Sequence, residues 1–513
     1  MTTLSPPASI ASRWQGILLS LPALVLSAWA YWPITANYFH SDDFMHLYLI
    51  ADGRLGEFLV TPHGGHLLVV RNALMALTHA VFGLDPRGYF WIALLTHLVN
   101  VALLFAIVAR LAGSRRLACA AAALWGVSPL NVDALGWYSV YGQVVLGTTL
   151  LFVLWRLARA MDPGVPWSRR EIVACYLAVL IGATCFGTGI GLALAFAAGI
   201  AICLPGASHR AARRSFASLL VAVPALYFVV RVLHRAVVAQ TADVAANAWP
   251  AISAMPVALA MTLHMMAFGA ARAMAGPWFP DAPYPGAALH VLAGVYTLAI
   301  AAGLWRGGAV ARRAIVTCLL LAVSGYGIIA AGRAIAAHGD PWVLIVLGLA
   351  ARYHYAPLLP LIIAGCTALA AIAGRRPMVP PRAANAALLV WLGAVAAGVY
   401  AWPPPIDHFD DERQQLAAFQ ALVRQRVAAS PPGATATVVN QPMYPVNAHA
   451  RMTTFPGWAG LFVVYFPTND VDGRAVRFVV RGANLIDAAR SRPGTRTAEL
   501  LISPAEARLG GGR

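Results

Sequence analysis

Two adjoining stretches decide the fold of this chain: the apolar run "ILLSLPALVLSAWAYWPI" (17–34) and the polar stretch "YFHSDDFMHLYL" (38–49). The run is long enough to cross a lipid bilayer, because a helical span needs about 20 mostly apolar residues. Asp42 and Asp43 follow it directly, between two histidines. Adjacent carboxylates repel each other and lose hydration near a membrane, so this placement indicates a specific role.

The apolar pattern continues along most of the chain. Of the 513 residues, 60% are hydrophobic and 11% are charged, whereas soluble domains carry about 25% charged residues. Apolar runs of about 20 residues recur from Trp14 to Trp402. The sequence therefore predicts a mainly α, polytopic helical membrane protein. The first run is too long for a signal-peptide core, so we expect it to be retained as an anchor.

The basic residues and the cysteines exclude two other classes of protein. All 37 basic residues are arginine and the net charge is +17, but they are spread among the connections between apolar runs. This distribution is typical of membrane topology determinants and argues against nucleic acid as a partner. The six cysteines lie in apolar runs without metal-ligand spacing. We expect buried thiols and no disulfide framework.

The arginine clusters predict the membrane topology, since short cytoplasmic connections are enriched in arginine. The clusters lie at 110–116, 156–170, 210–214, 306–313 and 375–382. About eleven spans fit this rule, with the N-terminus in the cytoplasm. They are 15–33, 89–111, 117–131, 137–158, 171–183, 186–204, 215–238, 286–305, 313–333, 354–373 and 384–402.

Two further apolar stretches, 67–84 and 251–276, are expected to lie flat at the outer interface. If 67–84 crossed the membrane, the next arginine cluster would face outside. Of the acids before residue 403, only Asp162 and Glu171 then fall on the cytoplasmic side. The pattern indicates polar chemistry on the outer face.

The composition changes after "YAWPPPIDH" (400–408). The segment 409–430 reads as an amphipathic helix, and "ATATVVN" (434–440), "GLFVVYF" (460–466) and "RAVRFVV" (474–480) read as strands. We therefore predict a transmembrane module over 1–402, with a first outer loop at 34–88, and a small extracytoplasmic α/β domain over 403–513. The sequence contains no nucleotide-binding loop, HExxH or GxSxG motif.

The first outer loop holds the first candidate site. Asp42 and Asp43 are candidates for a general base, because proximity raises the pKa of one carboxyl group. The alternative is that they cap the helix that follows, and both roles can hold at once. In "TPHGGHLLVVR" (61–71), His63 and His66 could bind a divalent metal together with Asp43. The simpler interpretation, interfacial histidines, ranks slightly ahead.

A second candidate site lies in "GVSPLNVDALGWYSVYGQ" (126–143). Its aromatic side chains next to a carboxylate and an amide suit a sugar ring, whose apolar faces stack and whose hydroxyls form hydrogen bonds. An aromatic belt at the interface would explain the rings alone. The candidates are Asp133, Trp137, Tyr138, Tyr141 and Gln143.

A third candidate site lies in "ARYHYAPLLPL" (351–361), where Arg352 and His354 begin a span. Arg333 ends the span before it. Arginines at the outer membrane surface that face into the protein suit a phosphate group, whereas arginines that snorkel to lipid headgroups would need no ligand.

Together these motifs resemble the GT-C superfamily of integral membrane glycosyltransferases, in particular its protein O-mannosyltransferase and lipid A aminoarabinose transferase branch. The resemblance is carried by "HSDDF" (40–44), "RNALMALTHAVFGLDPRGYFWIALLTHLVNVALL" (71–104) and "SPLNVDALGWYSVYGQVVLGTTLLFVLW" (128–155), and more weakly by "RYHYAPLLPL" (352–361). Arg71 stands where the mannosyltransferases carry a lysine. The sequence also has "ATCFGTG" (183–189) where some relatives have a Lys-Glu pair.

The resemblance implies a polyprenyl-phosphate sugar donor, used at the outer face of the inner (plasma) membrane, and a glycan, lipid or protein acceptor. Asp42 or Asp43 would deprotonate the acceptor hydroxyl, with inversion at the sugar. Arg71, Arg333 or Arg352 would hold the phosphate, and Asp133 would position the acceptor or a metal ion. Membrane lipids are the remaining partners, and no cofactor beyond a possible divalent metal is implied. The competing classes are a secondary transporter and a non-catalytic protein of cell-envelope polysaccharide assembly.

Overall fold

The computed structural model describes most of the transmembrane module and a few strands beyond it. The described residues are 10–51, 53–61, 66–162, 165–237, 255–278, 287–336, 346, 348–374, 380–429, 435–439, 470–471, 474–475, 477–481 and 499–502.

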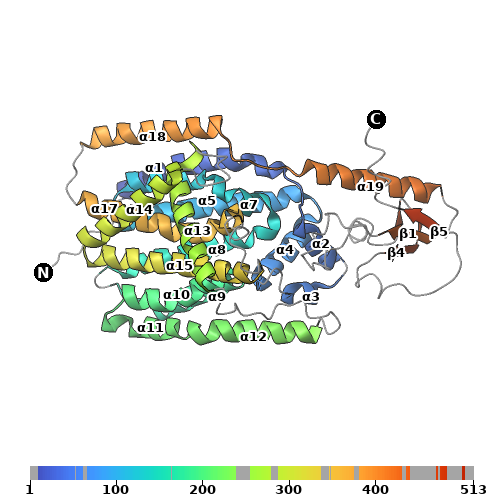
Figure 1. Ribbon diagram of the computed structural model, residues 1–513, viewed down its shortest axis with the longest axis horizontal. Coiled ribbons are helices and arrows are strands. Elements are labelled where there is room, and N and C mark those ends of the chain that lie inside the picture. Colours follow the sequence, from blue (N-terminus) through green and yellow to red (C-terminus); the bar gives the residue numbers. More distant parts are fainter. Residues whose placement is uncertain are drawn as a thin grey trace.

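Long helices pack side by side along most of their length (Figure 1). The first part of the chain contains α1 (Ile10–Tyr31), η1 (Trp32–Ala36), α2 (Asp42–Ala51), α3 (Leu55–Val60), α4 (Val69–Phe82), α5 (Pro86–Leu111), α6 (Arg115–Gly126), η2 (Pro129–Asn131), α7 (Val132–Gly136), η3 (Tyr138–Val140), α8 (Gly142–Ala160), α9 (Arg169–Ala183) and α10 (Thr188–Cys203). It continues with η4 (Ala207–His209), α11 (Arg210–Ala217), α12 (Leu219–Val237), α13 (Met255–Ala275), η6 (Gly276–Trp278), α14 (Ala287–Arg306), α15 (Ala309–Ala336), η7 (Ala351–Tyr353), α17 (Tyr355–Ala373), α18 (Pro381–Ala401) and α19 (Asp410–Ala428).

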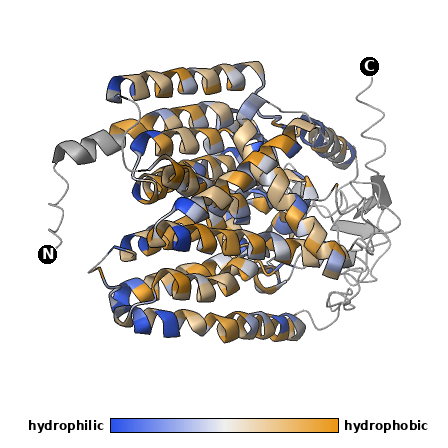
Figure 2. Cartoon of the chain, turned by 60° about the vertical axis from the view of Figure 1, so that its left-hand side comes forward, coloured by the Kyte–Doolittle hydropathy of each residue, from blue (hydrophilic) through white to orange (hydrophobic). Residues whose placement is uncertain are grey.

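Nine helices among the described residues are long and apolar enough to cross a membrane. The pair formed by α6 and the η2–α7 segment is bent by 56° and would make a tenth span. Apolar residues run along the helices (Figure 2). Their exposed apolar side chains include Leu220, Phe228 and Leu298. Such side chains suit lipid contact. The prediction of a mainly α, polytopic membrane protein is confirmed.

The structure breaks one of the expected spans and forms two others as short helices. The stretch 117–131 ends as a helix at Gly126, because Pro129 cannot continue the backbone hydrogen bonding. The stretches 171–183 and 186–204 form α9 and α10, which are 15 and 16 residues long. The apolar stretch 67–84 forms α4, a separate short helix. The stretch expected to lie flat at 251–276 forms α13, which is long enough to span.

The break between α6 and α7 is supported by hydrogen bonds from side chains. The Tyr31 hydroxyl donates a hydrogen bond to the backbone oxygen of Ser128. The Asn131 amide donates to the backbone oxygen of Trp125 at 2.7 Å, and the Asn37 amide donates to that of Gly136 at 3.1 Å. Unpaired backbone groups are costly at membrane depth, so these bonds allow the chain to turn there.

The two acids assigned to the cytoplasmic side are both paired with arginines of that side. Asp162 binds Arg110, which lies at the end of α5, and Glu171 binds Arg156 of α8. Glu171 also completes a capping box with Ser168 at the start of α9. These pairs therefore serve to close helix ends.

In the C-terminal segment, β1 (Thr435–Val439), β4 (Arg477–Arg481) and β5 (Glu499–Ile502) form a parallel sheet in the order β4-β1-β5. A short antiparallel pair joins β2 (Asp470–Val471) to β3 (Arg474–Ala475). The strands expected at 434–440 and 474–480 coincide with β1 and with β3–β4, whereas the strand expected at 460–466 lies outside the described residues. The α/β domain over 403–513 stays a prediction.

A buried polar network ties α5, α8 and α17 together. The Asn100 amide donates to the Tyr355 hydroxyl at 3.1 Å and to the backbone oxygen of Val144 at 2.9 Å, and it accepts from Thr148 at 2.7 Å. His97 Nδ1 lies 2.8 Å from the same Tyr355 hydroxyl. Nearly every polar group in this network has a partner. The network therefore fixes the positions of α5, α8 and α17 relative to one another.

We expect Asn100→Leu to destabilise the protein. The change keeps a similar side-chain volume but leaves the partners of Asn100 unpaired, which costs about 1–3 kcal/mol. The measurement is the thermal unfolding midpoint of the detergent-solubilised protein. Val99→Leu is the control, since Val99 is 50% exposed on the same helix. Equal midpoints for the two variants would contradict a stabilising role of the network.

Candidate active site

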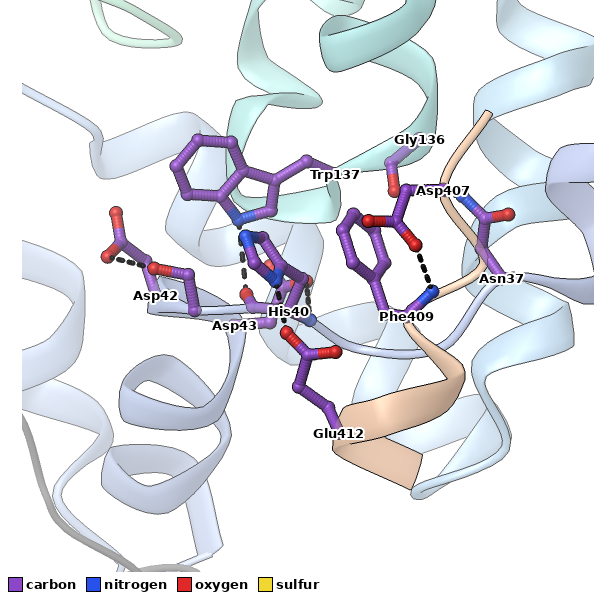
Figure 3. Close-up of polar contacts among 10 residues, drawn as sticks. Asn37, His40, Asp42, Asp43, Gly136, Trp137, Asp407, Phe409 and Glu412 are labelled. Atoms are coloured by element: carbon purple, nitrogen blue, oxygen red, sulfur yellow. Dashed lines mark hydrogen bonds and ion pairs between the residues drawn. The ribbon is translucent and has the colours of Figure 1, made fainter. Parts of the chain in front are cut away.

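The two acids of the first outer loop point in different directions from the start of α2. Successive residues of a helix project about 100° apart, so neighbouring side chains face different surroundings. Asp43 is wholly buried, whereas Asp42 is half-buried. Figure 3 shows the Asp42 carboxylate beside Ser41, away from the groups that surround Asp43. Ser41 itself has a φ of 48°, an uncommon conformation outside glycine. The pair is therefore not a pair of equivalent carboxylates.

Asp43 joins the first outer loop to the turn that precedes α8. Its Oδ1 accepts the backbone N–H of Ser139 at 2.6 Å and also the Ser139 hydroxyl. Its Oδ2 accepts the backbone N–H of His40 at 3.0 Å. The last bond links Asp43, in the first turn of α2, back to His40, which precedes the helix. Three donors on one carboxylate fix both its position and its orientation.

Burial raises the pKa of the Asp43 carboxyl to about 6. The hydrogen bonds from Ser139 and His40 oppose this shift, and the nearby charge of Asp42 adds a small further rise. The expected elevation of one pKa in the acidic pair is thus found, but its main cause is loss of hydration rather than the neighbouring carboxylate.

Arg71 of α4 is the buried cation beside this acidic pair. Its Nη1 lies 3.1 Å from His46 Nδ1, and its Nη2 lies 3.3 Å from His46 Nε2. Burial lowers the pKa of Arg71 to about 10, while the charges of Asp42 and Asp43 raise it. The guanidinium therefore stays protonated near neutral pH and balances part of the acidic charge.

Asp133 and Arg352, predicted in separate motifs, lie together. The backbone N–H of Arg352 donates to Asp133 Oδ2 at 3.2 Å, and Arg352 Nη1 lies 3.9 Å from the same oxygen. Both side chains are about one-third exposed. The carboxylate of Asp133 thus holds the η7 segment against α7.

Arg352 and Arg333 flank the same ring, that of Tyr353. The Arg352 Cζ lies 4.9 Å from the ring centroid, and the Arg333 Cζ lies 5.3 Å from it. Tyr353 is buried, and its hydroxyl has no hydrogen-bond partner among the described residues. Two guanidinium groups therefore lie close together here, one of them paired with Asp133, and such a cluster of positive charge favours an anion.

Trp137 connects these arginines to the acidic pair. Arg352 Cζ lies 6.0 Å from the Trp137 ring centroid. The Trp137 indole N–H donates to the backbone oxygen of His40 at 3.1 Å, and the N–H of His40 binds Asp43. One partly exposed aromatic ring therefore lies between the candidate base and the candidate anion site.

Four predicted site residues are packed into the interior instead. The rings of Tyr138 and Tyr141 stack on each other at 5.0 Å and are almost wholly buried. Gln143 is buried and donates to Thr188 at 3.2 Å. His354 uses both ring nitrogens, with Tyr326 and with the backbone oxygen of Gly348. These placements favour structural roles over sugar or phosphate binding.

Within the part of the chain that the structure describes, the histidines proposed as metal ligands do not form a metal site. His63 lies outside the described residues, and the His66 ring stacks on Phe186 with centroids 4.4 Å apart. The part of the chain that the structure describes contains no group of three His, Cys, Asp or Glu side chains suited to a metal ion. The Asp43 carboxylate is occupied by Ser139 and His40.

Sequence reasoning missed Ser139, His40 and Glu412. Ser139 lies inside the motif 126–143. A small hydroxyl side chain among aromatic residues could have been proposed there as a partner for a carboxylate. Glu412 of α19 lies 2.8 Å from His40 Nδ1, although the two residues are 372 positions apart. No pattern in a single sequence indicates a contact over that separation.

Comparisons with known proteins find similarity to solved structures. No protein-family model matches the chain, and no curated protein matches it. Among solved structures, the chain is similar to the crystal structure of ArnT from Cupriavidus metallidurans bound to undecaprenyl phosphate. The identity is 13%, over 95% of this chain and 90% of that chain, with a TM-score of 0.42.

Proposed function

We propose that this chain is an integral membrane glycosyltransferase that moves a sugar from a polyprenyl-phosphate donor to an acceptor hydroxyl. The observation that carries the proposal is a fixed acidic pair separated by one aromatic ring from two arginines around Tyr353. This arrangement offers a base for the acceptor and positive charge for a leaving phosphate, which are the two requirements of the reaction.

Access favours Asp42 as the general base. Asp42 is half-buried, whereas the oxygens of Asp43 are already held by Ser139 and His40. Asp42 takes the proton of the acceptor hydroxyl while the oxygen attacks the anomeric carbon. The bond from that carbon to the phosphate oxygen breaks, and the polyprenyl phosphate leaves with the electron pair. Attack opposite the leaving group inverts the anomeric centre.

Asp43 and Arg71 would hold this base in place. Arg71 interacts most strongly with Asp42 among the charged groups around it, and next with Asp43. The Asp43 carboxylate fixes α2 against the turn before α8. The two acids thus have different roles, with Asp42 reacting and Asp43 positioning.

The donor phosphate fits best between Arg352 and Arg333. Both arginines are partly exposed, whereas Arg71 is wholly buried. The phosphate gains charge as the sugar leaves, so guanidinium groups there stabilise the transition state more than the bound donor. The free hydroxyl of Tyr353 can donate a further hydrogen bond.

The proposed topology places the site on the outer face of the inner membrane. The N-terminus would be cytoplasmic, in line with the arginine-rich connections at the other end of the helices. Residues 403–513 would form an extracytoplasmic domain. Neither a glycan, a lipid nor a protein is favoured as acceptor by the described side chains.

We expect Asp42→Asn and Asp43→Asn each to lower transfer by roughly 10²–10⁴, because one removes the base and the other removes the group that fixes it. The measurement is transfer of a radiolabelled sugar from polyprenyl phosphate by the reconstituted protein. Asp85→Asn is the matched control, since Asp85 caps α5 in the same outer loop and Asn also caps well. Near-normal turnover in both site variants would refute the proposed function.

Transfer should also depend on the ionisation of Asp43. Its raised pKa means that the carboxylate is lost as the pH falls through about 6. A protonated Asp43 accepts fewer of its three hydrogen bonds, so kcat should fall below pH 6 and level off above it. A pH–rate profile that is flat between pH 5 and 7 would contradict this assignment.

Arg352→Ala should raise the KM for the lipid donor and lower kcat. Arg352→Lys should show a smaller change in the same direction, because lysine cannot bind two phosphate oxygens at once. Arg87→Ala is the control, since Arg87 is an exposed arginine of the first outer loop. If Arg352→Ala is silent while Arg71→Ala abolishes transfer, the phosphate lies beside the acidic pair instead.

A further inference from the structure

The first residues after the transmembrane module return to the loop that carries the acidic pair. The backbone N–H of Tyr38 donates to the backbone oxygen of His408 at 3.1 Å, and His408 Nδ1 lies 2.9 Å from Asn37 Oδ1. Arg413 donates to the backbone oxygen of Ala36 at 2.7 Å. The segment 408–413, here called the clasp, thus contacts the loop both before and beside His40.

His40 is contacted by two residues of the clasp. Its Nδ1 lies 2.8 Å from Glu412 Oε1, and its ring stacks on Phe409 with centroids 4.1 Å apart and an angle of 11° (Figure 3). The His40 and Glu412 side chains are only 25% and 17% exposed. A charge-assisted contact in such a place is less screened than one on an open surface.

The backbone of His40 faces the acidic pair at the same time. Its N–H donates to Asp43 Oδ2 and its C=O accepts from Trp137. A shift of His40 therefore moves two bonds at once, one to the positioning acid and one to the ring next to Arg352. The clasp touches neither carboxylate in any described contact, so it acts on them through His40.

Backbone strain is concentrated at this contact. Among the described residues, Ser41 and Phe409 have a positive φ without being glycine, with values of 48° and 54°. Such conformations cost of order 1–3 kcal/mol and persist only where the surroundings fix them. Ser41 directly follows His40 in the sequence, and the Phe409 ring stacks on the His40 ring. Both strained residues therefore adjoin His40.

From these observations we propose that Glu412 is a positioning residue for transfer, and that the clasp aligns the acidic pair through His40. The inference rests on the proposed function and extends it to the segment beyond the last span. The clasp is then part of the catalytic machinery in an indirect way, because it sets the geometry of the groups that react.

The first measurement tests the clasp without turnover. Glu412→Ala should speed hydrogen–deuterium exchange in a peptide covering residues 34–44 and leave exchange in a peptide within α5 unchanged. Asp411→Asn is the matched control, since Asp411 is an exposed acid of the same turn. Unchanged exchange at 34–44 in Glu412→Ala would overturn the proposal, whatever the activity.

The second measurement separates positioning from mere stability. The charged and titratable groups around Asp43 are Asp42, His40, Arg71, Tyr89 and Tyr138. The N–H and the charge of His40 both lower the pKa of Asp43. Glu412→Ala should therefore move the acid limb of the pH–rate profile upward and lower kcat about tenfold, with little change in the KM for the donor.

Glu412→Gln keeps an oxygen that can accept from His40, so it should recover most of the rate. Faster exchange at 34–44 with an unchanged kcat and acid limb would overturn the positioning role. Failure of the proposed function is seen separately, as absence of transfer by the wild-type protein from any polyprenyl-phosphate sugar, while the exchange result still reports on the clasp.

Discussion

The bonds between Asp43 and Ser139 are the interaction on which the rest of the site depends. They join α2, which would otherwise be a short surface helix, to the turn that leads into α8. That turn follows α7, where Asp133 binds the η7 segment. Through the carboxylates of Asp43 and Asp133, the first outer loop, the α7–α8 turn and the η7 segment before α17 are held together. A neutral residue at position 43 would accept fewer of these hydrogen bonds and leave buried donors unpaired.

Charge balance explains why this frame can exist in an apolar protein. Arg71 offsets part of the charge of Asp42 and Asp43, and Arg352 approaches Asp133. At the other end of the helices, Asp162 and Glu171 are bound by Arg110 and Arg156. Buried charges are tolerated when they are paired and hydrogen-bonded, so each acid is placed where an arginine can reach it.

The sequence was sufficient for the helical fold, because apolar length is a property of contiguous residues, whereas the acidic pair as a catalytic site stays a prediction. The sequence also indicated Asp133 and Arg352, although not that they touch. It was insufficient for Tyr138 and Tyr141, since a run of aromatics has the same composition in a core as on a sugar platform. The contact between Glu412 and His40 could not be predicted, because it depends on how the chain returns after many helices.

The broken helix between α6 and α7 has a consequence for how the protein responds to its bilayer. The backbone groups exposed by the break accept hydrogen bonds from Tyr31, Asn37 and Asn131. The turn that carries Asp133 and Ser139 is thereby anchored to neighbouring helices. Thinning or thickening of the hydrocarbon layer would tilt whole helices against lipid, but it would transmit little of that tilt to the turn. Lipid composition should alter how the donor reaches the protein more than how the protein handles it.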